Sequence, residues 1–229
     1  MKALILLAVC VGACRPSDGG AKSAANQGAP STATQPVSDS ARASALLERA
    51  DKARIQGDTA APVWIVEISD FECPFCKRWH DDTYSTLLRE YIGTGKARMA
   101  YVNFPLAQHL HALPAAEAAM CAAAQDRFWP MHDALFNTQD RWVAMTDAAP
   151  LFDSLAVATG VNATDWRDCT RSHVMQRLIA ADRGRALSAG ANSTPTFFVG
   201  DEPIRGAAPT NEFRAAVERA LSKAAAKPR

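Results

Sequence analysis

The sequence lacks an excess of charge of either sign and a hydrophobic run long enough to cross a membrane as a helix. Lys and Arg number 25 and Asp and Glu number 24, which leaves a net charge of +1 at pH 7. This balance gives no reason to expect nucleic acid or an acidic surface as a partner. The apolar run near the N-terminus covers residues 3–13, whereas a membrane-spanning helix needs about 20 residues.

The sequence also lacks a complete set of metal ligands. Structural zinc sites take four Cys, His or acidic ligands at regular spacings. Cys73 and Cys76 could join two of the five histidines, such as His109 and His111. No second CxxC and no well-spaced histidine pair completes a tetrahedron, so we predict neither a metal nor another cofactor.

What the chain does contain is a short stretch with the outline of a redox site. Apolar residues 62–68 predict a buried strand, and Cys73 and Cys76 follow it, separated by two residues. Pro74 suits the first position of a helix, because its missing N–H has no helical partner there. Cys73 then lies at the helix N-cap, where the helix dipole and unpaired N–H groups favour a thiolate. The thiolate is the reactive form of cysteine.

The N-terminal residues have the features of an export signal. One lysine followed by the apolar run predicts a signal peptide over residues 1–13. Val11-Gly12-Ala13-Cys14 resembles a bacterial lipobox, which predicts a lipid anchor on Cys14; the alternative is an ordinary cleaved signal. Residues 14–39, rich in small and polar residues, predict a disordered tether. We therefore expect an exported lipoprotein on the periplasmic side of a bacterial membrane, in an oxidising compartment.

The rest of the chain alternates between strand and helix patterns, and its apolar content of 48% is enough for a core. A mixed β-sheet flanked by helices follows from the order of these elements, so the fold class is α/β. The predicted segments are an N-terminal helix over 40–58, a first half with the CxxC over 59–106, an all-helical insert over 107–190 and a second half over 191–229.

Three motifs resemble one known family. They are Asp70-Phe71-Glu72-Cys73-Pro74-Phe75-Cys76, then Phe128-Trp129 with Met131-His132-Asp133, and finally Thr194-Pro195-Thr196-Phe197-Phe198-Val199. With the helical insert, they resemble the DsbA-like (DsbA- and BdbD-type) thiol:disulfide oxidoreductases of the thioredoxin superfamily, over about residues 60–223. The resemblance implies a thioredoxin fold with an inserted all-helical subdomain.

The resemblance also implies roles for Thr194 and Pro195. In the family, the matching proline has a cis peptide bond and lies against the active disulfide. The residue before it presents its backbone to an extended substrate segment, as in β-strand addition. We therefore expect Thr194 and Pro195 to bind substrate beside a redox-active Cys73–Cys76 disulfide.

Glu67 is a carboxylate inside an apolar strand, six residues before Cys73. From the residues alone, it either exchanges protons with the inner thiol of Cys76 from a buried position, or faces solvent or a structural partner. It matches the family's buried acidic residue, which favours the first role. The basic residue that some members carry near this acid falls at Met99, and the adjacent Arg98 is expected to face the other way.

Cys121 and Cys169 lie on separate predicted helices of the insert. In an exported chain we expect them to form a structural disulfide, and the resemblance implies a disulfide in the same subdomain. The alternative is two buried free thiols that act as small apolar residues.

The predicted function is exchange of the Cys73–Cys76 disulfide with cysteines of exported proteins, as a dithiol oxidase. A substrate thiolate attacks Cys73, and a second substrate thiol then displaces it. The alternatives are a disulfide isomerase or reductase of the same fold, or a non-catalytic peptide-binding or chaperone module. Expected partners are reduced or misoxidised exported proteins and a membrane or thioredoxin-like redox partner. Because isomerases of the superfamily tend to carry an extra dimerisation domain, we expect a monomer.

Overall fold

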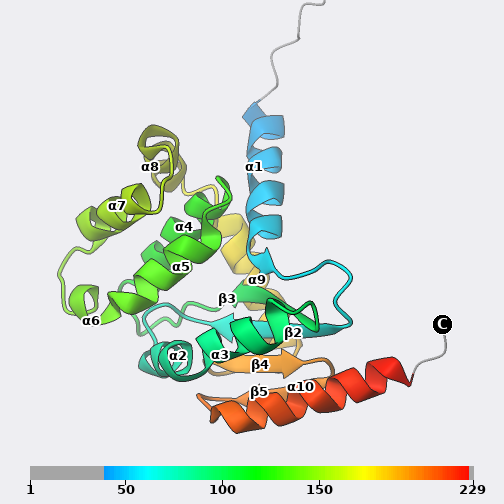
Figure 1. Ribbon diagram of the computed structural model, residues 1–229. Coiled ribbons are helices and arrows are strands. Elements are labelled where there is room, and N and C mark those ends of the chain that lie inside the picture. Colours follow the sequence, from blue (N-terminus) through cyan, green and yellow to red (C-terminus); the bar gives the residue numbers. More distant parts are fainter. Residues whose placement is uncertain (1–38, 227–229) are drawn as a thin grey trace, which may run out of the picture. The chain divides into compact units, whose positions relative to one another are not determined.

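A computed structural model describes residues 39–226 of the chain (Figure 1). Residues 1–38 and 227–229 lie outside the described part. The signal peptide, the lipid anchor at Cys14 and the tether up to residue 38 therefore stay predictions. Within residues 39–226, none of the helices combines the length and the apolar character needed to span a membrane.

A five-stranded mixed sheet forms the centre of the fold, in the order β1-β3-β2-β4-β5. Its strands are β1 (Ile55–Gln56), β2 (Val63–Ser69), β3 (Ala97–Asn103), β4 (Thr196–Val199) and β5 (Glu202–Arg205). Strands β2 and β3 are parallel, and the other neighbouring pairs are antiparallel. The mixed sheet that the order of elements predicts is thereby confirmed.

Side chains of β2 and β3 alternate between the two faces of the sheet, as a pleated strand requires. The odd-numbered residues of both strands are buried, and they include Glu67 and Met99. The even-numbered Arg98 lies on the opposite face, where its guanidinium stacks 3.9 Å from the centre of the Trp64 ring. Glu67 therefore belongs to the covered face of the sheet and not to a solvated one.

Helices flank the sheet on both faces. In chain order, the helices before the insert are α1 (Asp39–Ala53), α2 (Pro74–Trp79), η1 (His80–Tyr84), α3 (Ser85–Leu87) and η2 (Leu88–Ile92). The insert comprises α4 (Ala112–Ala123), α5 (Phe128–Asn137), α6 (Gln139–Trp142), α7 (Ala149–Ala158), α8 (Ala163–Ser172) and α9 (Gln176–Ser188), and α10 (Thr210–Ala225) follows β5.

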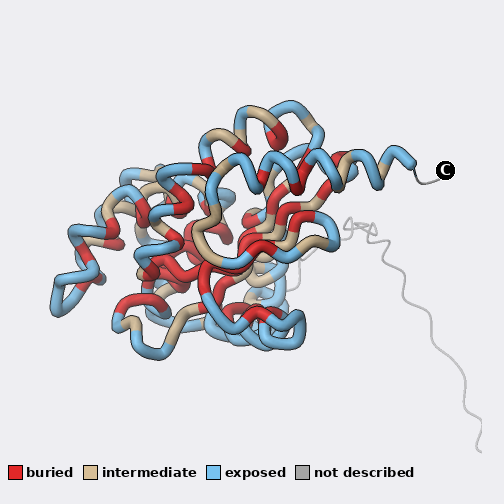
Figure 2. Tube along the Cα trace, turned by 90° about the horizontal axis from the view of Figure 1, so that it is seen from below, coloured by how far each residue is buried: buried red, intermediate tan, exposed pale blue. Residues whose placement is uncertain are grey.

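Different helices cover the two faces. On one face, the helices after the CxxC and α10 pack on β4 through Trp79, Phe197 and Phe213, whose ring centres are 4.5 to 5.7 Å apart. On the other face, Ala186 of α9 joins a smaller cluster with Ile68. In the view of Figure 1, α4, α5, α7 and α8 lie above the strands and α10 runs along the lower edge, beside β5. Figure 2 shows the buried segments concentrated in the interior of the fold.

The N-terminal helix is shorter than the prediction of a helix over 40–58. Helix α1 ends at Ala53, and Ile55–Gln56 form strand β1 on the edge of the sheet. These two residues form a strand because their backbone pairs with that of β3. Their side chains alone do not predict this pairing. Gly57 then turns the chain with φ of +105°, and a Cβ there would lie 2.9 Å from the backbone of β3.

The helix after the CxxC departs from a regular α-helix. The spacing predicts a helix to about Tyr91, and the segment is helical to Ile92, but η1 and η2 are π-helical. A π-helical turn inserts a residue relative to an α-helix, and such turns are frequent at functional sites. In η1, His80, Thr83 and Tyr84 are all buried. Hydrophobic spacing does not predict this inward placement of a histidine one turn after the CxxC.

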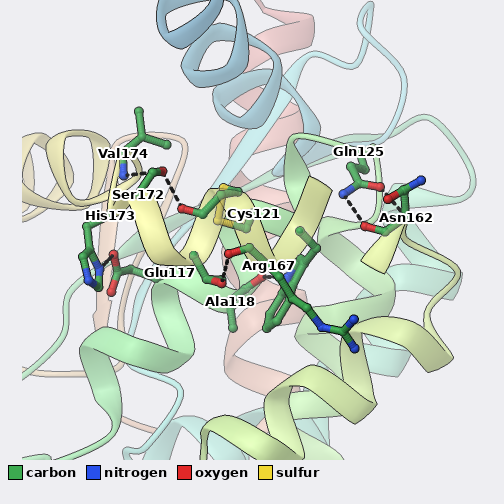
Figure 3. Close-up of a disulfide and its surroundings, with 12 residues drawn as sticks. Glu117, Ala118, Cys121, Gln125, Asn162, Arg167, Ser172, His173 and Val174 are labelled. Carbon is green, nitrogen blue, oxygen red and sulfur yellow. Dashed lines mark hydrogen bonds and ion pairs between the residues drawn. A yellow bond between two sulfur atoms is a disulfide. The ribbon is translucent and has the colours of Figure 1, made fainter. Parts of the chain in front are cut away.

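The insert contains a disulfide between Cys121 of α4 and Cys169 of α8, with an S–S distance of 2.02 Å (Figure 3). The same two helices are joined by a hydrogen bond of 3.1 Å from Trp166 Nε1 to the carbonyl oxygen of Ala118. Close by, the Nδ1 atom of His173 lies 2.9 Å from Glu117 Oε1. The disulfide is therefore part of a packed contact inside the insert.

Candidate active site

Cys73 and Cys76 lie where β2 leads into α2. Cys73 is the N-cap residue of α2, with an extended backbone (φ −70°, ψ 123°), and Pro74 begins the helix. Both cysteines are free thiols in this structure. Cys73 retains 3% of its surface and Cys76 none. The local geometry is the one that the position of Pro74 predicts, and Cys73 is the less buried of the two cysteines.

The two thiols differ widely in acidity. The Cys76 thiol lowers the pKa of Cys73 to about 6; Thr194 and the N–H groups of Phe75 and Cys76 add to this, while burial opposes it. Burial raises the pKa of Cys76 well above its usual range, and the adjacent Cys73 raises it further. At neutral pH the reduced pair therefore holds a thiolate on Cys73 and a thiol on Cys76.

The Thr194–Pro195 peptide bond is cis, and β4 begins directly after it. The Sγ atom of Cys73 lies 3.5 Å from the carbonyl oxygen of Thr194. Strand β4 pairs with β2 so that Thr196 is opposite Ile68, which carries the cis proline to the end of β2 where the CxxC begins. The structure thus brings Cys73, Thr194 and Pro195 together.

Asp70 ties the CxxC loop to the loop after β3. Its Oδ1 atom accepts a hydrogen bond of 2.8 Å from the N–H of Glu72, which tightens the turn before Cys73. Its Oδ2 atom accepts one of 2.9 Å from the N–H of Leu106 and lies 2.7 Å from His109 Nδ1. Burial raises the pKa of Asp70, and these hydrogen bonds partly offset the effect. This carboxylate therefore has a structural role beside the thiols.

Gln139 of α6 connects the insert to the active loop. Its side-chain amide donates to the carbonyl oxygens of Phe71 at 2.6 Å and Cys73 at 3.1 Å. Both acceptors are buried backbone groups that need a partner. The insert thus fixes the backbone of the reactive cysteine.

Glu67 lies beneath the site with its side chain fully buried. Its two carboxyl oxygens, the Ser69 hydroxyl and the Tyr101 hydroxyl have no hydrogen-bond partner among the described residues. Burial raises the pKa of Glu67 to about 8, although the nearby Ser69 hydroxyl and His80 lower it. The Ser69 hydroxyl also lowers the pKa of Cys76. The carboxyl group of Glu67 is therefore protonated at neutral pH, and the Ser69 hydroxyl influences both this acid and the inner thiol.

A group of polar side chains joins η1 to α5. Asp133 Oδ1 is 2.8 Å from His132 Nδ1 and 3.4 Å from His80 Nε2. Burial lowers the pKa of His132 to about 4, so this imidazole is neutral. The ligand atoms of these three side chains lie close enough to one another to hold a metal ion. Both histidines already pair with Asp133, however, and we assign no metal to them.

Sequence reasoning found the two thiols, Glu67, Thr194 and Pro195, and it missed the residues that support them. The motif with Met131-His132-Asp133 carries the resemblance, but it does not show that His132 and Asp133 form a polar group with His80. Nothing in the sequence marks Gln139, which lies on a helix of four residues.

Comparison with known proteins assigns the family. A profile of the thioredoxin family matches residues 49–219, and the chain belongs to this family. The match covers both halves of the sheet and the helical insert between them.

Two curated relatives differ in how much of their own length is matched. The chain is 34% identical over 183 residues to the Na⁺/H⁺ antiporter NhaA 3 of Salinispora tropica, which covers 78% of this chain and 26% of that protein. It is 25% identical over 174 residues to disulfide bond formation protein D of Bacillus subtilis, which covers 73% of this chain and 76% of that protein. The chain thus spans about a quarter of the antiporter, and the function of that whole protein does not carry over.

Solved structures show the same fold. BdbD from Bacillus subtilis in its oxidised form has a TM-score of 0.68 at 24% identity, covering 75% of this chain and 94% of that chain. The alpha-DsbA1 protein of Wolbachia pipientis has a TM-score of 0.65 at 23% identity, covering 75% of this chain and 92% of that chain. The chain therefore has the thioredoxin fold of the DsbA- and BdbD-type proteins, as the resemblance implies.

Proposed function

We propose that the chain is a thiol:disulfide oxidoreductase that acts outside the cytoplasm as a dithiol oxidase. The names of the relative from Bacillus subtilis and of the DsbA- and BdbD-type structures support the reaction class. The predicted signal peptide and the lipobox-like segment ending at Cys14 support the location. The substrates are reduced exported proteins, and a membrane or thioredoxin-like partner restores the disulfide.

The observation that carries the proposal is the contrast between the two thiols. The pKa of Cys73 is lowered to about 6, whereas burial raises the pKa of Cys76 well above its usual range. A stabilised Cys73 thiolate is a good leaving group and stabilises the reduced form of the pair. A pair whose reduced form is stabilised is an oxidant, which is why the dithiol oxidase is preferred to a reductase.

The reaction follows from this contrast. A substrate thiolate attacks Cys73, the Cys73–Cys76 bond breaks, and Cys76 leaves with the electron pair and takes up one proton. The second substrate thiol then loses its proton and attacks the substrate sulfur of the mixed disulfide, and Cys73 leaves as a thiolate. The substrate dithiol is oxidised to a disulfide, and the pair is reduced by the same two electrons.

Thr194 and Glu67 have separate roles in this reaction. The backbone of Thr194 lies 3.5 Å from the Cys73 sulfur, where an extended substrate would pair with it by β-strand addition. Glu67 gives a proton to Cys76 when the disulfide opens and takes it back when the pair is reoxidised. The contact of Thr194 with Cys73 supports the first role, and the buried, protonated carboxyl group of Glu67 supports the second.

The experiment is a measurement of the reduction potential of the Cys73–Cys76 pair against glutathione, together with refolding of a reduced, disulfide-containing substrate. We expect a potential well above that of thioredoxin, which is about −270 mV, and refolding that requires the oxidised pair. Cys73→Ser abolishes refolding, whereas Cys76→Ser accumulates a mixed disulfide through Cys73. A potential near that of thioredoxin would overturn the oxidase role, and unimpaired activity of Cys73→Ser would indicate a non-catalytic binding module.

A further inference from the structure

Gln139 is a buried glutamine that faces residues 70–73, the loop that leads into the CxxC. It begins the short helix α6, and 3% of its surface is exposed. Trp142 lies three residues further along α6 and is fully buried, and its Nε1 atom donates to the carbonyl oxygen of Leu135 at 3.0 Å. Residues three apart share one face of a helix. The buried indole therefore anchors α6 in the insert and turns Gln139 inwards.

The side-chain amide of Gln139 binds two carbonyl groups of this loop. It donates to the oxygen of Phe71 at 2.6 Å and to that of Cys73 at 3.1 Å. Both partners are acceptors, so the NH₂ group and not the amide oxygen faces them. The N–H of Lys77 also donates to the Cys73 carbonyl at 3.1 Å. Gln139 thus fixes the peptide group that follows Phe71 and the one that follows Cys73.

Other contacts hold the loop without Gln139. The carbonyl oxygen of Asp70 accepts a hydrogen bond of 3.1 Å from the N–H of Cys73. The ring of Phe71 packs on that of Phe136 in α5, with centres 5.1 Å apart. A variant without the Gln139 amide therefore keeps the turn and the apolar anchor of the loop, and it loses control over the direction of two carbonyl groups.

The backbone of Cys73 decides which groups its sulfur meets. Cys73 precedes Pro74, which has no N–H, so the first N–H groups of α2 belong to Phe75 and Cys76. These two N–H groups favour the thiolate of Cys73. A change in the ψ angle of Cys73, now 123°, turns its carbonyl group and α2 relative to its sulfur. A hydrogen bond that fixes this carbonyl group therefore also fixes the sulfur against the N–H groups.

We propose that Gln139 is a positioning residue for the reactive thiol, because its hydrogen bonds to the Phe71 and Cys73 carbonyl groups hold the Cys73 sulfur against the first N–H groups of α2. Gln139 acts through the backbone of Cys73. Its effect on disulfide exchange rests on the proposed function. A less stabilised thiolate is a poorer leaving group and stabilises the reduced pair less, so loss of the amide makes the pair a weaker oxidant.

The test is alkylation of Cys73 by iodoacetamide in the reduced full chain, followed by mass spectrometry as a function of pH. We expect the midpoint of about 6 to rise by about half to one pH unit in Gln139→Met, as the loss of one hydrogen bond predicts. Methionine is an unbranched side chain that has no N–H donor. Gln125→Met is the matched control and leaves the midpoint unchanged, because Gln125 binds the backbone of Asn162 elsewhere in the insert.

A second substitution separates hydrogen bonding from packing. Gln139→Ala loses both the donor and the side-chain volume, and we expect it to raise the midpoint at least as far as Gln139→Met. An unmoved midpoint in folded Gln139→Met, even if Gln139→Ala raises it, would overturn the assignment, and so would an equal rise in Gln125→Met. If Gln139→Met does not fold, NMR of the unmodified chain decides: the side-chain amide signals of Gln139 must shift with the ionisation of Cys73, and constant signals would refute the role.

Disulfide exchange gives an independent readout. In Gln139→Met, the equilibrium with glutathione shifts towards the Cys73–Cys76 disulfide by about three- to tenfold, whereas Gln125→Met leaves it unchanged. A raised alkylation midpoint with an unshifted equilibrium would contradict the role of Gln139 in exchange. A potential near that of thioredoxin in the unmodified chain, with the midpoint still raised in Gln139→Met, would instead overturn the proposed function and leave the positioning of Cys73 by Gln139 supported.

Discussion

The sulfur of Cys73 lies 3.5 Å from the backbone carbonyl oxygen of Thr194, 121 residues further along the chain. The contact exists because β4 pairs with β2 and begins directly after the cis Thr194–Pro195 bond. One residue of the site comes from a helix N-terminus and the other from a strand start. Their meeting places a reactive thiolate against the backbone that precedes the cis proline.

The acidity of Cys73 is directly measurable. We expect its alkylation by iodoacetamide to rise with pH through a midpoint of about 6, because the thiolate is the nucleophile. Cys76→Ala raises the midpoint, since the Cys76 thiol is the largest stabilising influence on the Cys73 thiolate. The unfolded chain, with a midpoint of about 8.5, provides the reference, and a folded-state midpoint near that value would contradict the site described here.

Glu67 makes stability depend on pH. Its pKa is raised from 4.5 to about 8 on folding, so the folded chain binds a proton that the unfolded chain has lost between these values. The contribution of Glu67 to stability is therefore complete below about pH 4.5 and falls as pH rises towards 8. We expect the unfolding free energy of Glu67→Gln, relative to that of the unmodified chain, to increase by about 3 kcal/mol as the pH rises from about 5 to about 8. Urea unfolding at several pH values measures this, and a pH-independent difference would show that Glu67 is ionised in the folded protein.

The disulfide of the insert stabilises the fold. Cys121 and Cys169 are 48 residues apart, and closing a loop of this length lowers the entropy of the unfolded chain by an amount worth about 4 kcal/mol. We expect the Cys121→Ala/Cys169→Ala double variant to lose about 2 to 5 kcal/mol of unfolding free energy. Its Cys73 alkylation midpoint stays the same, because the disulfide lies in the insert away from the thiols. A double variant as stable as the parent under oxidising conditions would contradict this assignment.

A buried ion pair joins three segments behind the site. Arg54 donates to Asp182 of α9, and Asp182 also accepts from the backbone and side-chain nitrogens of Asn103 at 3.1 and 2.9 Å. Asp182→Asn removes the fully buried carboxylate and leaves Arg54 with the more exposed Asp51 as its ion-pair partner, so we expect a loss of about 1.5 to 3 kcal/mol. Asp153→Asn is the matched control, because it breaks an exposed pair with Arg167 and costs less than about 1 kcal/mol. Chemical denaturation measures the unfolding free energy of the two variants. Equal losses would show that the buried pair contributes no more to stability than the exposed one.

Local signals in the sequence account for the elements that were predicted well. Strand β2 and the N-cap at Cys73 depend on an apolar run and on one proline. Helix α8 likewise begins at Asn162, whose side chain accepts from the N–H of Asp165. Each of these features involves residues close together in the chain, so a pattern of neighbours is enough to predict it.

Features made by distant segments were not predictable in the same way. Strand β1 exists because the edge of β3 pairs with two residues that follow a helix. The π-helical turn that buries His80 becomes visible only in the backbone hydrogen bonding. Gln139 reaches the Cys73 carbonyl from a helix 66 residues away. In each case the stabilising interaction is with a distant segment of the chain that the local sequence does not specify.

The sequence by itself determined the reactive pair, the strand that carries Glu67 and the class of fold, because these follow from residue type and spacing. Tertiary structure decided the surroundings of Glu67. It buried the carboxyl group completely and placed Arg98 on the opposite face of the sheet. Burial and long-range contacts set the pKa values of Cys73, Cys76 and Glu67, and these values govern the chemistry. They are properties of the packed fold and not of any single stretch of residues.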